Sequence, residues 1–150
     1  MADKASRIYP DVITFAFWIR RASVLAVKEK HYVSNYYHLG RGVAFHIAPS
    51  NVPVNYAYSL VSGLVTGNAN IVRIPSKDFP QVAIINKAIN DVLVKFEKIT
   101  KYIALVQYGR DKDINDCLSS ISDVRIIWGG DATVEHITGI PAADGCVDIA

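Results

Sequence analysis

Two kinds of hydrophobic pattern alternate along this chain. Short, mostly apolar runs are separated by longer segments in which apolar residues recur every three or four positions. The short runs are typical of strands buried on both faces of a parallel sheet, and the longer segments are typical of amphipathic helices. The runs predict strands at residues 42–48, 70–74, 103–106, 124–128 and 146–150.

The helical segments carry start and stop signals. Pro10 and Asp11 open the first helix, Gly67 ends the second, and Asp78 is placed to cap the third. The patterns predict helices at residues 10–30, 54–65, 78–98, about 111–121 and 131–138. Strands separated by helices at this spacing form right-handed βαβ units. The predicted fold class is therefore α/β, with a Rossmann-like, doubly wound parallel sheet, and residues 1–150 are expected to form a single domain.

Composition and charge exclude several classes of protein. Of the 150 residues, 51% are hydrophobic and 20% are charged, which excludes a disordered chain. The 16 basic and 14 acidic residues are interspersed, so we expect no nucleic-acid partner. No apolar stretch reaches the roughly 18 residues of a membrane span, and no signal peptide is visible, so we expect a cytoplasmic protein without a membrane span.

The two cysteines and the end of the chain add two expectations. Cys117 and Cys146 provide neither a disulfide framework nor the spacing of a metal site, so no metal is predicted. Residues 146–150 resemble a buried strand and no polar tail follows them. Natural chains usually end in residues that can fray in water. We therefore expect the sequence to be a piece of a longer protein.

The segment after the first predicted strand is a candidate site, because ligands of doubly wound sheets bind beyond the carboxyl ends of the strands. Residues 49–53 contain no glycine, so this segment is neither a G-x-G-x-x-G turn nor a Walker loop. Asn51 has two interpretations. Its residue type favours a turn residue or a helix N-cap, and the alternative is an amide that donates to an oxyanion.

Two glycine-containing segments have a structural and a functional interpretation. Gly129, Gly130 and Asp131 follow the fourth strand at the start of a helix, where bare backbone amides can hold a phosphate. A simple turn is the more common meaning of two adjacent glycines. Gly67 and Asn68 are interpreted as a helix C-cap.

Other chemistry-bearing residues are interpreted as structural. His46 lies inside a predicted buried strand, where a hydrogen-bonded core residue is more common than a ligand. Cys117 and Cys146 have no base beside them and are interpreted as buried residues rather than nucleophiles. A group of tyrosines lacks interleaved basic residues and is therefore interpreted as packing rather than as a base-stacking surface. Its members are Tyr32, Tyr36, Tyr37, Tyr56 and Tyr58.

A succession of motifs carries a resemblance to a known family. Residues 42–53 end in Pro-Ser-Asn-Val-Pro, a helix follows, and Gly67-Asn68 precedes the strand at 70–74 and then Pro75-Ser76. This order resembles the cofactor-binding half of the aldehyde dehydrogenase superfamily, which has a Pro-x-Asn-x-Pro turn, a Gly-Asn pair and a Lys-Pro-Ser/Ala-Glu turn. Gly129-Gly130 lies where that superfamily has a Gly-Ser turn.

A closer resemblance covers nearly the whole chain. Residues 9–18, which begin Tyr-Pro-Asp-Val, and residues 45–53 are similar to the LuxC-type long-chain fatty acyl-CoA reductases associated with bacterial bioluminescence. The resemblance implies an aldehyde dehydrogenase-type nucleotide-binding domain. It also implies a reaction in which a cysteine attacks an acyl-CoA thioester and NADPH delivers the hydride that releases the aldehyde.

The resemblance also implies roles for individual residues. Asn51 matches the asparagine whose amide holds the developing oxyanion. The cofactor is expected to lie along Ala48, Pro49 and Ser50 and along the turn formed by Gly129, Gly130 and Asp131. The nucleophilic cysteine is expected beyond residue 150, so the chain alone is expected to be inactive. In the full-length protein we expect acyl-CoA as the substrate, acyl-transfer enzymes as partners and a homo-oligomer.

The sequence departs from the superfamily after the second strand. Where the superfamily has Lys-Pro-Ser-Glu, residues 74–77 are Ile-Pro-Ser-Lys and Arg73 lies one position earlier. Arg73, Ser76 and Lys77 predict a cradle for the 2′-phosphate of NADPH, because a basic residue at this strand end tolerates that phosphate. The alternative is a surface turn with two solvated basic side chains and Asp78 as a helix cap.

Two other functions remain open at this point. One is a different aldehyde dehydrogenase relative that acts on aldehydes or acyl phosphates. The other is a Rossmann-like binding module without chemistry of its own. A nucleophilic cysteine beyond the end of this sequence would favour the reductase over the module.

Overall fold

The computed structural model describes residues 7–31 and 36–150 and contains a five-stranded parallel sheet. The strands are β1 (Val43–Ile47), β2 (Ala69–Arg73), β3 (Ile103–Val106), β4 (Val124–Ile127) and β5 (Val147–Ile149). The helices are α1 (Pro10–Trp18), α2 (Arg21–His31), α3 (Asn55–Val65), α4 (Pro80–Lys95), α5 (Glu97–Thr100), α6 (Lys112–Ser120) and α7 (Asp131–Thr138). The predicted α/β fold with a doubly wound parallel sheet is confirmed.

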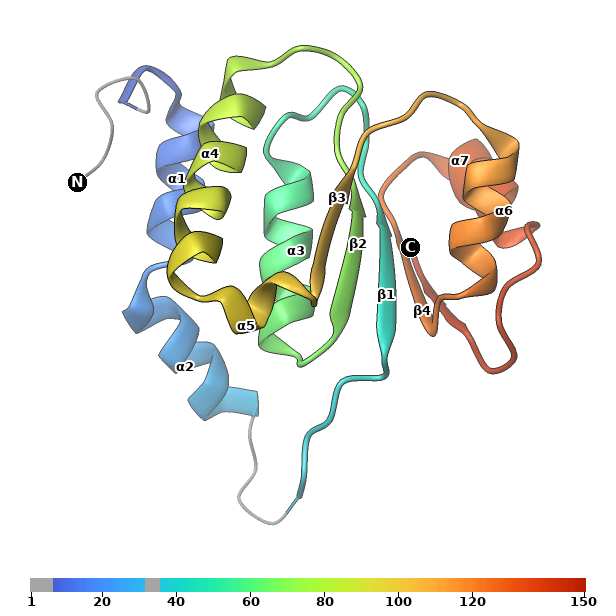
Figure 1. Cartoon of the computed structure of the whole chain (residues 1–150), viewed down its shortest axis with the longest axis horizontal. Coiled ribbons are helices and arrows are strands. Elements are labelled where there is room, and N and C mark those ends of the chain that lie inside the picture. The colour runs from blue at the N-terminus through green and yellow to red at the C-terminus, as the bar shows by residue number, and fades with distance from the viewer. Residues whose placement is uncertain (1–6, 32–35) are drawn as a thin grey trace.

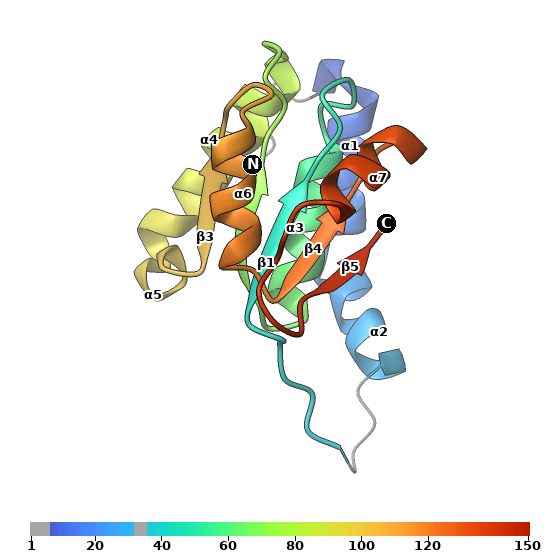
Figure 2. The same ribbon diagram turned by 90° about the vertical axis from the view of Figure 1, so that its right-hand side faces the viewer.

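The strand order, β3-β2-β1-β4-β5, sets the layers of the molecule. The chain builds outward from β1 to β3, and then returns through α6 to place β4 on the other side of β1. Helices α1, α3 and α4 cover one face of the sheet, and α6 and α7 cover the other (Figures 1 and 2). The order therefore reverses between β1 and β4, which is the position where ligands of doubly wound sheets bind.

The central strand β1 is buried on both faces, as its apolar run predicts. Ala44, Phe45, His46 and Ile47 each expose 2% or less of their surface. Phe45 and Ile47 pack with Ile137 in the layer of α7. None of the helices in the described part of the chain is long and apolar enough to span a membrane.

The single helix predicted at 10–30 is wrong, because the structure has two helices separated at Ile19 and Arg20. Val12 and Phe15 of α1 are buried in the core, whereas α2 has no buried residue. At the junction, the Ser23 hydroxyl donates to the carbonyl of Phe17, at 3.5 Å. Such side-chain bonds compete with the helical backbone pattern, and here the chain turns at the point where the apolar face ends.

The helix predicted at 78–98 is also divided, and its predicted cap is wrong. The structure has α4 from Pro80 and the short α5, with a break at Phe96. Phe79 is the N-cap residue and no side chain caps the helix. Pro80 explains this start, because a proline keeps the preceding residue extended and is well placed in the first helical turn. Asp78 therefore lies outside the helix.

The predicted burial of the last strand is wrong for the structure of this chain. All three residues of β5 are exposed, including Val147 at 39% and Ile149 at 54%. The reason is topological, because β5 pairs with β4 alone and forms the edge of the sheet. The apolar composition of residues 146–150 identified a strand, but composition does not distinguish an edge strand from a central strand of the sheet.

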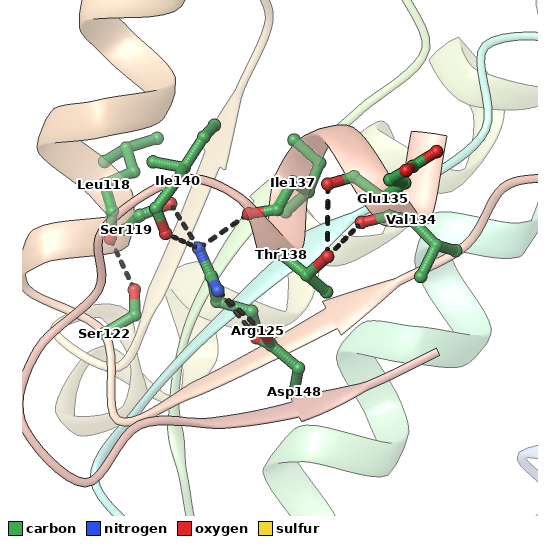
Figure 3. A network of polar contacts seen from close by, with 10 residues as sticks. All are labelled: Leu118, Ser119, Ser122, Arg125, Val134, Glu135, Ile137, Thr138, Ile140 and Asp148. Carbon is green, nitrogen blue, oxygen red and sulfur yellow. Dashed lines mark hydrogen bonds and ion pairs between the residues drawn. The ribbon is translucent and has the colours of Figure 1, made fainter. Parts of the chain in front are cut away.

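A buried arginine ties β4 and β5 to the helices on their face (Figure 3). Arg125 on β4 is 3% exposed, and its Nε and Nη2 each donate to one carboxylate oxygen of Asp148 at 2.7 Å. Its Nη1 donates to the carbonyls of Ile137 at 2.9 Å and Ile140 at 2.8 Å, with Ser119 Oγ at 3.4 Å. One guanidinium thus joins β4, β5, α6 and the end of α7.

We predict that Arg125→Met lowers the free energy of unfolding by about 3 kcal/mol, because breaking a buried ion pair leaves its partners unsatisfied. Urea unfolding of the two proteins measures the difference. Arg110→Met, which changes an exposed arginine, serves as the matched control. An Arg125→Met protein as stable as the control would contradict the structural role of this side chain.

Candidate functional site

The loops that leave β1 and β4 lie next to each other at the carboxyl edge of the sheet, which is the upper edge in Figure 1. Ile47 and Ile127 are paired in the parallel register, and the N–H of Trp128 donates to the carbonyl of Ile47 at 2.9 Å. We call residues 48–51 and 128–131 the switch-point loops. They contain most of the predicted site residues, which the structure therefore brings to one place.

The first switch-point loop is a turn that precedes α3. Ala48 is buried and Pro49 is half-buried, whereas Ser50 and Asn51 are exposed. The N-cap of α3 is Val54, and no side chain caps this helix. The N-cap interpretation of Asn51 is therefore wrong. Asn51 lies in an exposed turn, and its role as an oxyanion donor stays a prediction.

The second switch-point loop opens directly onto the N-terminus of α7. Gly130 is the N-cap residue, and a Cβ added to it would meet nothing within 4 Å. A Cβ on Gly129 would instead lie 2.8 Å from the side chain of Thr133. The backbone at Gly130 is thus approachable, and its first-turn amides suit an anion. Asp131 in the same turn opposes a phosphate by charge repulsion.

The predicted 2′-phosphate cradle is only partly assembled. Arg73 Nη2 donates to the carbonyl of Gly109 at 2.8 Å and of Tyr108 at 3.4 Å, and the guanidinium lies 4.7 Å from the centre of the Tyr108 ring. Ser76 and Lys77 are exposed in the turn after β2. Arg73 is therefore bound to the loop after β3, rather than solvated as the alternative interpretation required.

A chain of buried polar groups lies beneath the switch-point loops. His46 is fully buried, with Nδ1 at 2.6 Å from Ser59 Oγ and Nε2 at 2.9 Å from Asn70 Oδ1. Trp128 Nε1 donates to Ser59 Oγ at 3.1 Å, and Asn70 Nδ2 donates to the carbonyl of Asn68 at 2.7 Å. Because Asn70 Oδ1 only accepts, we assign the His46 proton to Nε2, and Ser59 then donates to Nδ1.

This His46 network is structural. Its serine, histidine and asparagine have the residue types of a nucleophile, a base and an orienting group. Ser59 is only 3% exposed and His46 is 0% exposed, however, so the network lies out of reach of a substrate. The interpretation of His46 as a hydrogen-bonded core residue is confirmed. Sequence analysis missed Ser59 and Asn70, although a serine within the buried apolar face of a helix is a usable signal.

Gly67 and Asn68 form the predicted C-cap. The N–H of Asn68 donates to the carbonyl of Gly63 and the N–H of Gly67 donates to that of Leu64, both at 3.0 Å. This pair of bonds is a Schellman motif, and the φ of +83° at Gly67 explains the glycine. Asn68 Oδ1 also accepts from the N–H of Arg41 at 2.8 Å, which fixes the entry to β1.

Two hollows in the structure lie away from the switch-point loops. One of about 540 Å³ runs between α1, α3 and α4, and one of about 340 Å³ lies between α2 and α3 near Trp18. Both are lined mainly by apolar side chains. Neither of these two hollows is lined by residues of the switch-point loops.

Comparison with known proteins gives the family. The family described as Acyl-CoA reductase (LuxC) matches residues 20–150, which is most of the chain. The chain belongs to the LuxC family of acyl-CoA reductases. It is 31% identical over 103 residues to a long-chain acyl-protein thioester reductase 2 of Photobacterium leiognathi. It is 30% identical over 98 residues to a long-chain acyl-protein thioester reductase of Aliivibrio fischeri.

The matches with these LuxC relatives are partial in length. They cover 67% and 63% of this chain but only 21% and 20% of the relatives. The chain thus spans about a fifth of the length of the curated relatives that it matches.

The cysteines and several tyrosines of this LuxC chain differ from the prediction. Cys117 is exposed and Cys146 is half-buried, so the prediction that both are buried is wrong. Burial raises the pKa of the Cys146 thiol, which favours its protonated, unreactive form. Tyr36 and Tyr37 are exposed rather than packed.

The remaining tyrosines of the group divide as follows. Tyr56 is buried and donates to Asn86 Oδ1 at 2.7 Å. Tyr58 packs against the rings of Phe15 and Trp18. The packing interpretation is confirmed for these two residues, and Tyr32 lies outside the described residues.

The buried imidazole of His46 predicts a pH dependence of stability. Burial lowers its pKa below the ordinary value, more than the hydrogen bond to Asn70 raises it. The unfolded chain therefore binds a proton near pH 6.5 that the folded chain excludes, and stability falls as the pH drops through that value. The slope from this residue is at most about 1.4 kcal/mol per pH unit.

Urea unfolding between about pH 5 and 7.5 measures this dependence. We expect His46→Gln, whose amide can donate to Asn70 and accept from Ser59, to flatten the profile. The matched control, His136→Gln, changes an exposed histidine of α7 and should leave the profile unaltered. An unchanged slope in His46→Gln would show that other groups cause the pH dependence.

Proposed function

We propose that this chain is the cofactor-binding domain of a longer, NADPH-dependent reductase of long-chain acyl thioesters. The observation that carries the proposal is the meeting of two loops at the reversal of the strand order in a LuxC family member. One loop carries Asn51, and the other carries the open glycine turn at the N-terminus of α7. Loops at this position of a doubly wound sheet are where dinucleotides bind.

Each part of the carboxyl edge has a separate role in the proposal. The N–H groups at Gly130 and the start of α7 hold the pyrophosphate, because they are bare and approachable. Lys77 and Ser76 bind the 2′-phosphate together with Arg73, whose guanidinium is held by the carbonyls of Tyr108 and Gly109. The backbone of residues 48–50 lines the cofactor. The bound dinucleotide supplies the hydride that reduces the acyl group.

Asn51 is proposed to act on the substrate. Its side-chain amide donates to the thioester oxygen as negative charge develops there, and such donors lower the barrier without adding a charge to the ground state. The nucleophilic cysteine is proposed to lie in the part of the enzyme outside this chain. Cys117 is exposed on α6 and Cys146 has a raised pKa, so neither has the environment of an activated thiol.

The substrate is proposed to be a long-chain acyl thioester. The name of the family gives acyl-CoA, and the names of the two relatives give an acyl-protein thioester. The thioester group is common to both, and acyl-CoA is our proposal for the substrate itself. We further propose a cytoplasmic homo-oligomer that exchanges acyl groups with acyl-transfer enzymes.

The oxyanion role of Asn51 gives a kinetic prediction. In the full-length enzyme, Asn51→Ala should lower kcat by about 10²–10³, because one donor to the oxyanion is lost, and should leave cofactor affinity nearly unchanged. Aldehyde formation from an acyl-CoA measures kcat. Asn90→Ala, on the exposed surface of α4, is the control. If the Asn51→Ala enzyme keeps its kcat and only unfolds at a lower temperature, Asn51 is a turn residue and does not stabilise the oxyanion.

The 2′-phosphate cradle gives a binding prediction. The full-length enzyme should bind NADPH more tightly than NADH by about tenfold or more, because bonds to a charged phosphate contribute roughly 1.5–3 kcal/mol. Lys77→Glu should abolish the preference and Arg73→Ala should reduce it.

The matched control is Lys95→Glu, which makes the same charge change at the C-terminal end of α4. Equilibrium titration with both cofactors measures the preference. Equal affinity for NADPH and NADH in the wild-type enzyme, or a preference that neither substitution alters, would overturn the assignment.

A further inference from the structure

Trp128 is a half-exposed aromatic side chain at the switch point. It is the first residue after β4, immediately before the Gly129-Gly130 turn, and 43% of its surface is exposed. Its backbone N–H donates to Ile47 and its indole N–H donates to Ser59 on α3, at 2.9 and 3.1 Å. The residue is therefore held at both the backbone and the ring.

The group that holds the ring is itself fixed. Ser59 Oγ lies 2.6 Å from Nδ1 of the buried His46, and the other ring nitrogen of His46 bonds to Asn70. The orientation of an exposed indole is thus set by buried bonds that reach β1 and β2. Because folding already fixes the orientation of this side chain, a ligand that stacks on it does not pay the entropy of ordering it. The indole is therefore a preorganised binding surface.

We infer that Trp128 is a binding residue for the cofactor, and that its indole face stacks on the nicotinamide ring. The inference rests on the proposed function. With the 2′-phosphate at the end of β2 and the pyrophosphate at the turn after β4, the adenosine half lies toward β2. The nicotinamide half then continues from the pyrophosphate at the turn after β4, and Trp128 is the residue that immediately precedes this turn.

A purely structural role for Trp128 makes different predictions. In that case the indole N–H matters only as an anchor between β4 and α3, and the aromatic face contacts no ligand. Trp128→Phe removes the N–H and keeps a flat face, whereas Trp128→Leu removes both. A structural role predicts that both variants lose stability and keep their affinity for the cofactor.

The test uses the full-length protein labelled with 5-fluorotryptophan and fluorine NMR. The resonance of Trp128 is assigned by its absence in Trp128→Phe. Saturation with NADP⁺ or with nicotinamide mononucleotide should shift this resonance, because a stacked ring changes the local magnetic field. Adenosine 2′,5′-bisphosphate, which carries the other half of the cofactor, should bind and leave the resonance in place.

Affinity provides the second measurement. Trp128→Leu should weaken NADP⁺ binding by about tenfold, which is typical for the loss of one stacking partner, and Trp128→Phe should weaken it much less. Trp18→Leu is the matched control, because Trp18 is 40% exposed but packs against Tyr58 and lines the hollow next to α2, away from the switch-point loops.

The outcomes separate this inference from the proposed function. NADP⁺ binding without a shift of the Trp128 resonance, or with equal affinity in Trp128→Leu, overturns the inference and leaves the proposed function standing. A shift with adenosine 2′,5′-bisphosphate alone assigns Trp128 to the adenine and overturns the nicotinamide contact. Absence of dinucleotide binding overturns both. Should Trp128→Leu fail to fold, the fluorine spectra of the wild-type protein still decide.

Discussion

The hydrogen bonds of the buried His46 ring constrain the centre of this fold. A ring with no exposed surface must have both nitrogens bonded, and the partners come from α3 and β2. Ser59, the α3 partner, also accepts from Trp128 after β4. The position of β1 relative to three neighbouring segments thus depends on one imidazole. Both switch-point loops start from strands that this network joins. The network therefore helps to set the positions of the two loops of the candidate site.

Arg125 has the corresponding role on the opposite face of the sheet. Its guanidinium bonds to Asp148 on β5 and to two carbonyls at the end of α7, so it sets where α7 lies against β4 (Figure 3). The N-terminus of the same helix carries the glycine turn of the candidate site. A polar network on each face therefore supports β4, and the loop after β4 is held from both sides of the sheet.

The sequence was sufficient to predict the sheet, because parallel strands are short apolar runs with helices between them. The candidate loops were also predictable, since their place at the carboxyl edge follows from strand direction alone. Features that depend on tertiary contacts were not predictable. The exposure of β5 follows from its place at the sheet edge, and the binding of Arg73 to Gly109 joins the end of β2 to a loop 36 positions further along the chain. The proline-directed start of α4 was available in the sequence, but Asp78 was assigned the cap instead.

The central claim is that the two switch-point loops form a dinucleotide site, and backbone amide NMR tests it most directly. In a titration of the ¹⁵N-labelled chain with NADP⁺, the account predicts shifts at residues 48–51, 73–77 and 128–132. Amides of α2 and α5, at the opposite edge of the sheet in Figure 1, should stay unchanged. Shifts confined to the apolar hollow between α1 and α4, with the switch-point loops unaffected, would contradict the account.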